Sequence, residues 1–131
     1  MIEFLIPRRP VSLQIRKRKN LQSWKQYVAG IATEKWNDEV IESKDLRLTL
    51  VYICDDSPAD IDNIIKPIQD SMVGVIYKDD IQISDVDSHR RYLSDPIEID
   101  NLPDLLVQAI EIGNEAVYVK VSEAENLGIY L

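Results

Sequence analysis

Several residue types that carry chemistry in other proteins are scarce in this chain of 131 residues, which has one cysteine, one histidine and four glycines. One thiol cannot form an internal disulfide, so we expect a reducing compartment, the cytoplasm. Cys54 lies in an apolar run and is expected to be a small buried side chain. One histidine and one cysteine cannot supply a structural zinc site. No glycine-rich phosphate loop is present, and nothing organises His89 or Cys54 as part of a nucleophilic pair.

Long hydrophobic runs are also missing. No apolar stretch approaches the roughly 20 residues that a membrane helix requires. The N-terminal residues MIEFLIPRRP place their basic charges after a short apolar stretch, the reverse of a secretory signal. Hydrophobic residues make up 45% of the chain and charged residues 29%, which is typical of a folded protein. We therefore expect one domain over residues 1–131 and no association with a membrane.

Charge is distributed unevenly along the chain. The net charge of −8 argues against binding to nucleic acid. Residues 1–25, however, contain seven basic residues and a single acid, Glu3. This local excess permits contacts to DNA phosphates, although a solvated flexible segment would explain it equally well. The candidate DNA-binding residues are Arg8, Arg9, Arg16, Lys17, Arg18 and Lys19.

Hydrophobic periodicity predicts an α+β fold with a mixed sheet and two to three helices. The expected strands are residues 2–6, 46–54 and 115–122, with a hairpin or bent strand over 75–77 and 80–92. The expected helices are residues 21–36, about 61–73, and 102–112. Because Ile81 and Ile83 would face one side of that bent strand, Asp80 would face the other.

The segment over residues 60–83 concentrates the candidate chemistry. Asp60 and Asp62 lie at the start of the second predicted helix, Lys66 follows Asp62 by one helical turn, and Asp79 and Asp80 come after the helix. Carboxylates that converge from two parts of a chain suit a divalent cation such as Mg²⁺. A lysine on the same face adds a positive charge that phosphoryl-transfer chemistry can use. A calcium-binding EF-hand loop is excluded, because one that began at Asp55 would place Lys66 where a bidentate glutamate is needed.

Each of these acids also has an ordinary structural explanation. Asp60 could cap the helix, Asp62 and Lys66 could form an exposed ion pair, and turns commonly contain aspartate. The case for a site therefore depends on their joint arrangement. The connection between the helix and Asp80 is short, so the two groups of acids should lie close together and repel each other unless a cation is bound.

The order Asp-x-Asp-Asn-x-x-Lys-x-x-x-Asp, then Gly, then Asp-Asp-x-Gln-Ile resembles the RusA family of Holliday junction resolvases. The matching positions are Asp60, Asp62, Asn63, Lys66, Asp70, Gly74, Asp79, Asp80, Gln82 and Ile83. The basic segment over residues 8–28 is similar to the start of that family as well. The region after Tyr92 has no counterpart that we can assign.

The resemblance implies a homodimeric endodeoxyribonuclease of DNA recombination and repair that cuts four-way junctions by paired symmetric nicks. It also implies Mg²⁺ as the cofactor, with Mn²⁺ as an alternative. Asp60, Asp62 and Asp80 match the essential acids, Lys66 matches the essential lysine, and Asp79 matches a neighbouring acid at the metal site. Two alternatives stay open: a nuclease for other branched DNA, such as flaps, and a non-catalytic module that binds DNA or protein.

Overall fold

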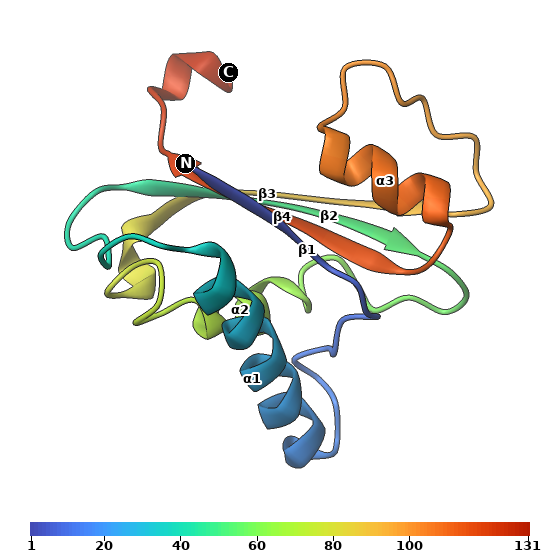
Figure 1. Cartoon of the computed structure of the whole chain (residues 1–131), viewed down its shortest axis with the longest axis horizontal. Coiled ribbons are helices and arrows are strands. Elements are labelled where there is room, and N and C mark those ends of the chain that lie inside the picture. The colour runs from blue at the N-terminus through green and yellow to red at the C-terminus, as the bar shows by residue number, and fades with distance from the viewer.

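A four-stranded sheet lies at the centre of the fold in the computed structural model, which describes residues 1–131 (Figure 1). The strand order is β1-β4-β2-β3. β4 is antiparallel to both of its neighbours, whereas β2 and β3 are parallel, so the sheet is mixed. The strands are β1 (Ile2–Ile6), β2 (Leu46–Cys54), β3 (Ile83–Tyr92) and β4 (Ala116–Glu123).

Helices cover both faces of this sheet. α1 (Arg18–Lys35) and α2 (Ile65–Ser71) lie on one face, and α3 (Asp104–Ile112) lies on the other (Figure 1). Two short 3₁₀ helices, η1 (Asp80–Gln82) and η2 (Leu127–Ile129), complete the chain. The predicted α+β class and mixed sheet are confirmed. No helix combines the length and the apolar character that crossing a membrane would require.

The main core lies between the sheet and the α1–α2 layer. Side chains alternate along β2, so Leu48 and Leu50 are fully buried against the helices while Thr49 points to the opposite face. From α1, Trp24 and Val28 enter the same core. The amphipathic pattern predicted for this helix is therefore confirmed, although the helix begins at Arg18 rather than at Leu21.

α2 is shorter than the sequence suggested. Residues 61–64 form a turn, and the helix begins at Ile65. Pro67 is consequently the third helical residue, where its missing N–H has no helical acceptor to lose. Asp60 is not the helix cap, because Ile64 occupies that position and no side chain caps the helix. Gly74 lies beyond the C-cap with a φ of 80°, a conformation that favours glycine.

No strand begins at Asp80, which corrects the predicted hairpin or bent strand over 75–77 and 80–92. The Asp79 side chain accepts a hydrogen bond from the Ile81 N–H at 3.1 Å, and the Gln82 Oε1 accepts one from the Asp79 N–H at 3.0 Å. This reciprocal capping starts a 3₁₀ turn instead of a strand. β3 then begins at Ile83 and pairs in parallel with β2. The orientation of Asp80 is therefore set by the 3₁₀ turn and not by the alternation of side chains along a strand.

Candidate active site

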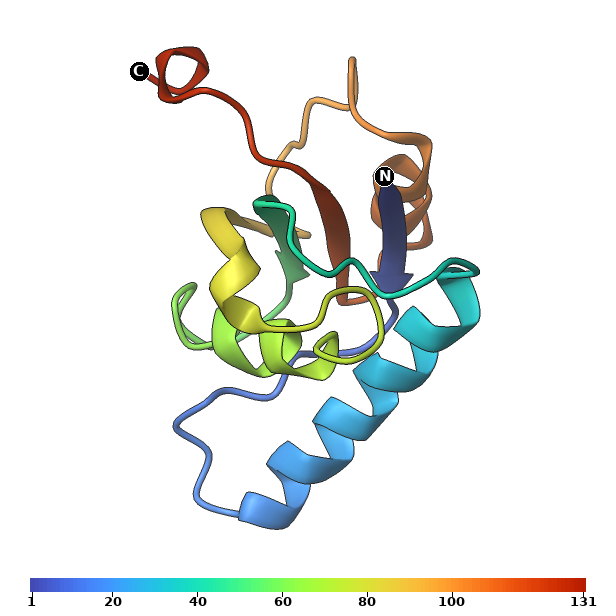
Figure 2. The ribbon, with the colours of Figure 1, turned by 90° about the vertical axis from the view of Figure 1, so that its left-hand side faces the viewer.

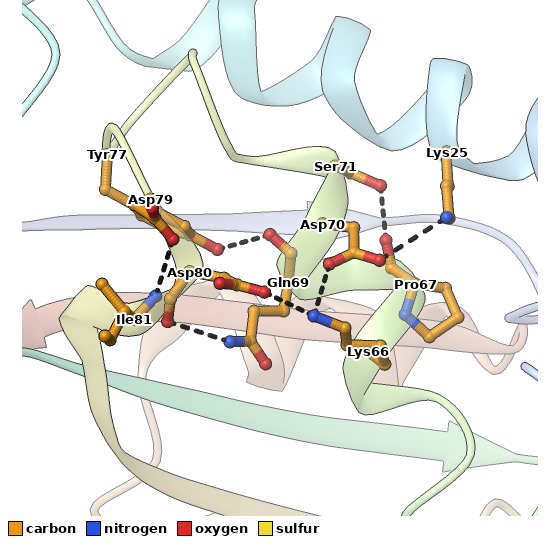
Figure 3. Close-up of polar contacts among 10 residues, drawn as sticks. All are labelled: Lys25, Lys66, Pro67, Gln69, Asp70, Ser71, Tyr77, Asp79, Asp80 and Ile81. Carbon is orange, nitrogen blue, oxygen red and sulfur yellow. Dashed lines mark hydrogen bonds and ion pairs between the residues drawn. The ribbon is translucent and has the colours of Figure 1, made fainter.

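Lys66 lies between two carboxylates (Figure 3). Its Nζ is 2.9 Å from the Asp70 Oδ1 and also contacts the Asp80 Oδ2. Asp70 is one turn further along α2, whereas Asp80 is the first residue of η1. Of the two later acids that the sequence singled out, Asp79 and Asp80, the structure brings Asp80 into contact with Lys66.

These contacts fix the charge states of the groups. The hydrogen bond from Lys66 to Asp80, followed by the one to Asp70, raises the pKa of Lys66 above its ordinary value. The same hydrogen bond from Lys66, followed by one with Asp79, lowers the pKa of Asp80. Lys66 is thus a cation and Asp80 an anion throughout the neutral pH range.

Two glutamine side chains, Gln82 and Gln69, hold η1 against its surroundings. The Gln82 side chain is buried and donates hydrogen bonds to the carbonyl oxygens of Ile41 at 3.1 Å and Lys44 at 3.3 Å. The Gln69 Nε2 donates to the Asp80 carbonyl at 3.3 Å (Figure 3). The position of Asp80 is therefore fixed from two directions.

Two contributors were missed as site residues from the sequence. Asp70 bonds Lys66 and also lies 3.5 Å, between Oδ2 and Nζ, from Lys25 of α1 (Figure 3). The spacing of four residues between Lys66 and Asp70 was the available signal. Gln82 was visible in the motif, but its anchoring role depends on residues 41–44, which are far away in the sequence.

Asp60 and Asp62 lie in the turn before α2, and both are exposed. The turn is closed by a hydrogen bond from the Asn63 N–H to the Asp60 carbonyl at 3.0 Å. Neither carboxylate forms an ion pair, and neither accepts a side-chain hydrogen bond. The segment between β1 and α1 runs beside this turn, where the Leu13 N–H donates to the Asn63 carbonyl at 2.9 Å (Figure 2).

The single chain does not gather three or more His, Cys, Asp or Glu side chains that could hold a metal ion. Mg²⁺ is usually bound by one or two carboxylates together with waters and substrate phosphates, rather than by a cage made only of protein. The donor type therefore fits Mg²⁺, provided that substrate oxygens complete its ligands. The candidate donors are Asp60, Asp62, Asp79 and Asp80.

The structure divides the six basic candidate residues into two groups. Arg8 lies over the Tyr27 ring at 3.9 Å, and Arg9 bonds the loop after β2. The other four are exposed and form no ion pair or side-chain hydrogen bond: Arg16, Lys17, Arg18 and Lys19. They surround the N-terminus of α1, where positive charge opposes the helix dipole. Their placement does not favour the stability of the helix, but the helix N-terminus and the four cations all attract phosphate.

A protonated lysine held by carboxylates is an arrangement that can stabilise the negative charge developed in phosphoryl transfer, which is the chemistry of the nuclease class. The family model described as Endodeoxyribonuclease RusA matches residues 8–100, from the basic segment through β3. The chain therefore belongs to the RusA endodeoxyribonuclease family. Members of this family act on branched DNA junctions and generally depend on divalent metal ions. No curated protein sequence matches the chain significantly.

Proposed function

We propose that this protein is a Mg²⁺-dependent endodeoxyribonuclease that resolves four-way DNA junctions by paired symmetric nicks. The observation that carries the proposal is the contact between Lys66 and Asp80, which joins α2 to η1 within the segment that matches the family. The proposed setting is DNA recombination and repair in the cytoplasm, with residues 1–131 acting as one domain.

Lys66 is proposed to stabilise negative charge on the phosphate as the phosphodiester bond breaks. Its raised pKa keeps it protonated, so it donates hydrogen bonds and cannot act as the general base. Asp80 and Asp70 hold the ammonium group in place. Binding of the phosphate beside Lys66 would then exchange one protein anion for a substrate anion.

Asp60, Asp62 and Asp80 are proposed to hold Mg²⁺, with Mn²⁺ as an alternative and Asp79 as an additional ligand. A bound divalent cation supplies an activated water and stabilises charge on the phosphate. The chain's own contribution is to keep Asp80 ionised and in contact with Lys66. The lowered pKa of Asp80 supports this role.

Contacts to the DNA backbone are assigned mainly to the four unpaired cations of Arg16–Lys19. Such contacts position the duplex and set the salt dependence without reading its sequence. Arg8 and Arg9 are weaker candidates, since their guanidinium groups already have partners. Two opposed nicks need two active sites, and we therefore propose a two-fold symmetric homodimer.

The test compares cleavage of a synthetic four-way junction, a linear duplex and a flap, each with Mg²⁺ and with EDTA. We expect symmetric nicks in the junction only when Mg²⁺ is present, and none by Asp62→Asn. If no substrate is cut under any condition, the nuclease proposal is wrong. If the flap is cut and the junction is not, the chemistry stands and the junction substrate is wrong.

A further inference from the structure

The loop that joins β2 to α2 carries Asp60 and Asp62. A residue from another part of the chain, Arg9, forms hydrogen bonds to the first part of this loop. The Arg9 Nη1 donates a hydrogen bond to the Asp56 carbonyl at 2.8 Å, and the Arg9 Nη2 donates to the Ser57 carbonyl. One guanidinium group therefore binds two consecutive carbonyl oxygens just upstream of the acidic turn. A planar fork of donors suits this arrangement in a way that a lysine does not.

Glu115 completes the contact from the other end of the chain. Its Oε1 lies 3.2 Å from the Arg9 Nη1 and accepts a hydrogen bond from the Asp55 N–H at 2.8 Å. Its Oε2 is 3.5 Å from the Tyr52 hydroxyl oxygen. The Glu115 side chain is only 15% exposed, so its contact with Arg9 is partly shielded from solvent.

The backbone in this loop needs such support. Ser57 has a φ of 50°, one of two non-glycine residues with positive φ in the chain. This conformation costs a residue other than glycine about 1–2 kcal/mol, so it persists where surrounding contacts hold it. The Arg9 guanidinium bonds the carbonyl of this same residue.

The remainder of the loop is held as well. The Arg90 Nη1 donates to the Ala59 carbonyl at 3.4 Å, and the Leu13 N–H donates to the Asn63 carbonyl at 2.9 Å. Both ends of the acidic turn are thus tethered, while the carboxylates of Asp60 and Asp62 project without protein partners. Of these tethers, the one made by Arg9 involves the strained residue.

We propose that Arg9 is a positioning residue for the active site. Together with Glu115, it fixes the loop over residues 55–57 and thereby the turn that carries Asp60 and Asp62 just before α2. This inference rests on the proposed nuclease function. It replaces the interpretation of Arg9 as a phosphate-binding residue, which its sequence neighbourhood had suggested.

Arg8 provides a matched control for the contact with the loop. It is the adjacent basic residue, it lies over Tyr27, and it does not touch the loop. Arg9→Ala and Arg9→Lys should each lower kcat on the junction by about 10- to 100-fold, the range seen when a residue that orients a metal ligand is removed. The Kd for the junction and its salt dependence should stay within about twofold of wild type. Arg91→Ala, which removes an exposed arginine whose Nη1 donates to the Arg90 carbonyl at 2.9 Å, should leave kcat unchanged.

Hydrogen exchange of the metal-free protein gives a second readout that does not depend on cleavage. We expect faster exchange of the backbone amides of residues 55–63 in both Arg9 variants and unchanged exchange in Arg8→Ala. If the wild-type protein cuts no DNA, the proposed function fails while this measurement still tests the loop. The proposal is overturned if the Arg9 variants weaken DNA binding and lower the salt slope while loop exchange is unchanged. Arg9→Lys covers the case in which the alanine variant does not fold, and wild-type kcat with wild-type exchange in Arg9→Lys would also overturn it.

Discussion

The carboxylates of the candidate active site form two groups that differ in how their charge is balanced. Asp70 and Asp80 share the ammonium group of Lys66, so the chain itself supplies their counter-charge. Asp60 and Asp62 are exposed and have no cationic partner. The paired group is thus organised before any ligand arrives, whereas the unpaired group has its charge available for one.

This difference separates two tasks within one site. The paired acids keep the lysine charged and fixed in position, which is what a preorganised electrostatic site requires. The unpaired acids, in the proposed mechanism, would bind a divalent cation without first displacing a protein cation. Removing a member of either group should therefore produce distinguishable defects, and the following experiments are ordered by expected effect.

The largest effect is expected from Asp62→Asn. If Asp62 holds the metal as proposed, its loss removes several kcal/mol of charge stabilisation, so cleavage should fall by about 1,000-fold or more. Binding of the junction in EDTA should persist, as measured by gel shift. Asp56→Asn, another exposed acid of the same loop, is the control and should cut normally. Near-normal cleavage by Asp62→Asn would remove Asp62 from the metal site.

Lys66→Ala should reduce single-turnover cleavage by about 100- to 1,000-fold, as expected when one charge-stabilising donor is removed. Metal binding should not weaken, because Asp80 is released from its ion pair. Lys78→Ala removes an exposed lysine that lies 3.6 Å, between Nζ and Oε2, from Glu42, and serves as the control. Retained turnover in Lys66→Ala would show that the lysine only organises the acids.

Replacing the basic residues of Arg16–Lys19 with glutamine should weaken junction binding and leave cleavage at saturating DNA unchanged. The slope of log K against log salt should fall by about 0.9 for each DNA phosphate that the protein no longer neutralises. Lys44→Gln, which removes a lysine already paired with Glu123 at 2.8 Å, is the control. An unchanged slope would place the DNA elsewhere on the surface.

The smallest effect concerns acid titration. Lys66 lowers the pKa of Asp80, so this pair contributes stability above the ordinary aspartate pKa and loses it as the pH falls through the lowered value. In Lys66→Met, carbon-detected NMR should show the Asp80 pKa shifted upward toward its ordinary range. An unchanged titration would mean that another group, such as Asp79, controls Asp80.

The sequence predicted the fold best where a repeating pattern was decisive. The strands over 2–6 and 46–54 were predicted with their observed bounds, because burial alternates along β1 and the first part of β2, and the last three residues of β2 are continuously buried. The start of α2 was misplaced, since the turn before it has a composition compatible with a helix. The turn at Asp80 was missed although Asp79 and Gln82 have the spacing of a capping box.

The site was predictable only in part, because a local sequence pattern reports contacts between nearby residues and not contacts between residues far apart in the chain. The contact between Lys66 and Asp80 follows from a short connection, and the sequence indicated it. The contact between Arg9 and Glu115 joins residues 106 positions apart, and no local pattern reports it. The strand order could not be predicted from the sequence either, because β1 pairs with β4, a strand far away in the sequence.

That strand order has a consequence for how the molecule is made. β4 lies between β1 and β2, and it is the only strand neighbour of β1. β1 therefore has to wait, unpaired, until residues 116–123 have been synthesised. Glu115, which fixes Arg9, emerges at the same late moment. We expect the acidic loop to acquire its final shape only after residues 115–123 have joined the sheet, because until then neither β1 nor Arg9 has its partner.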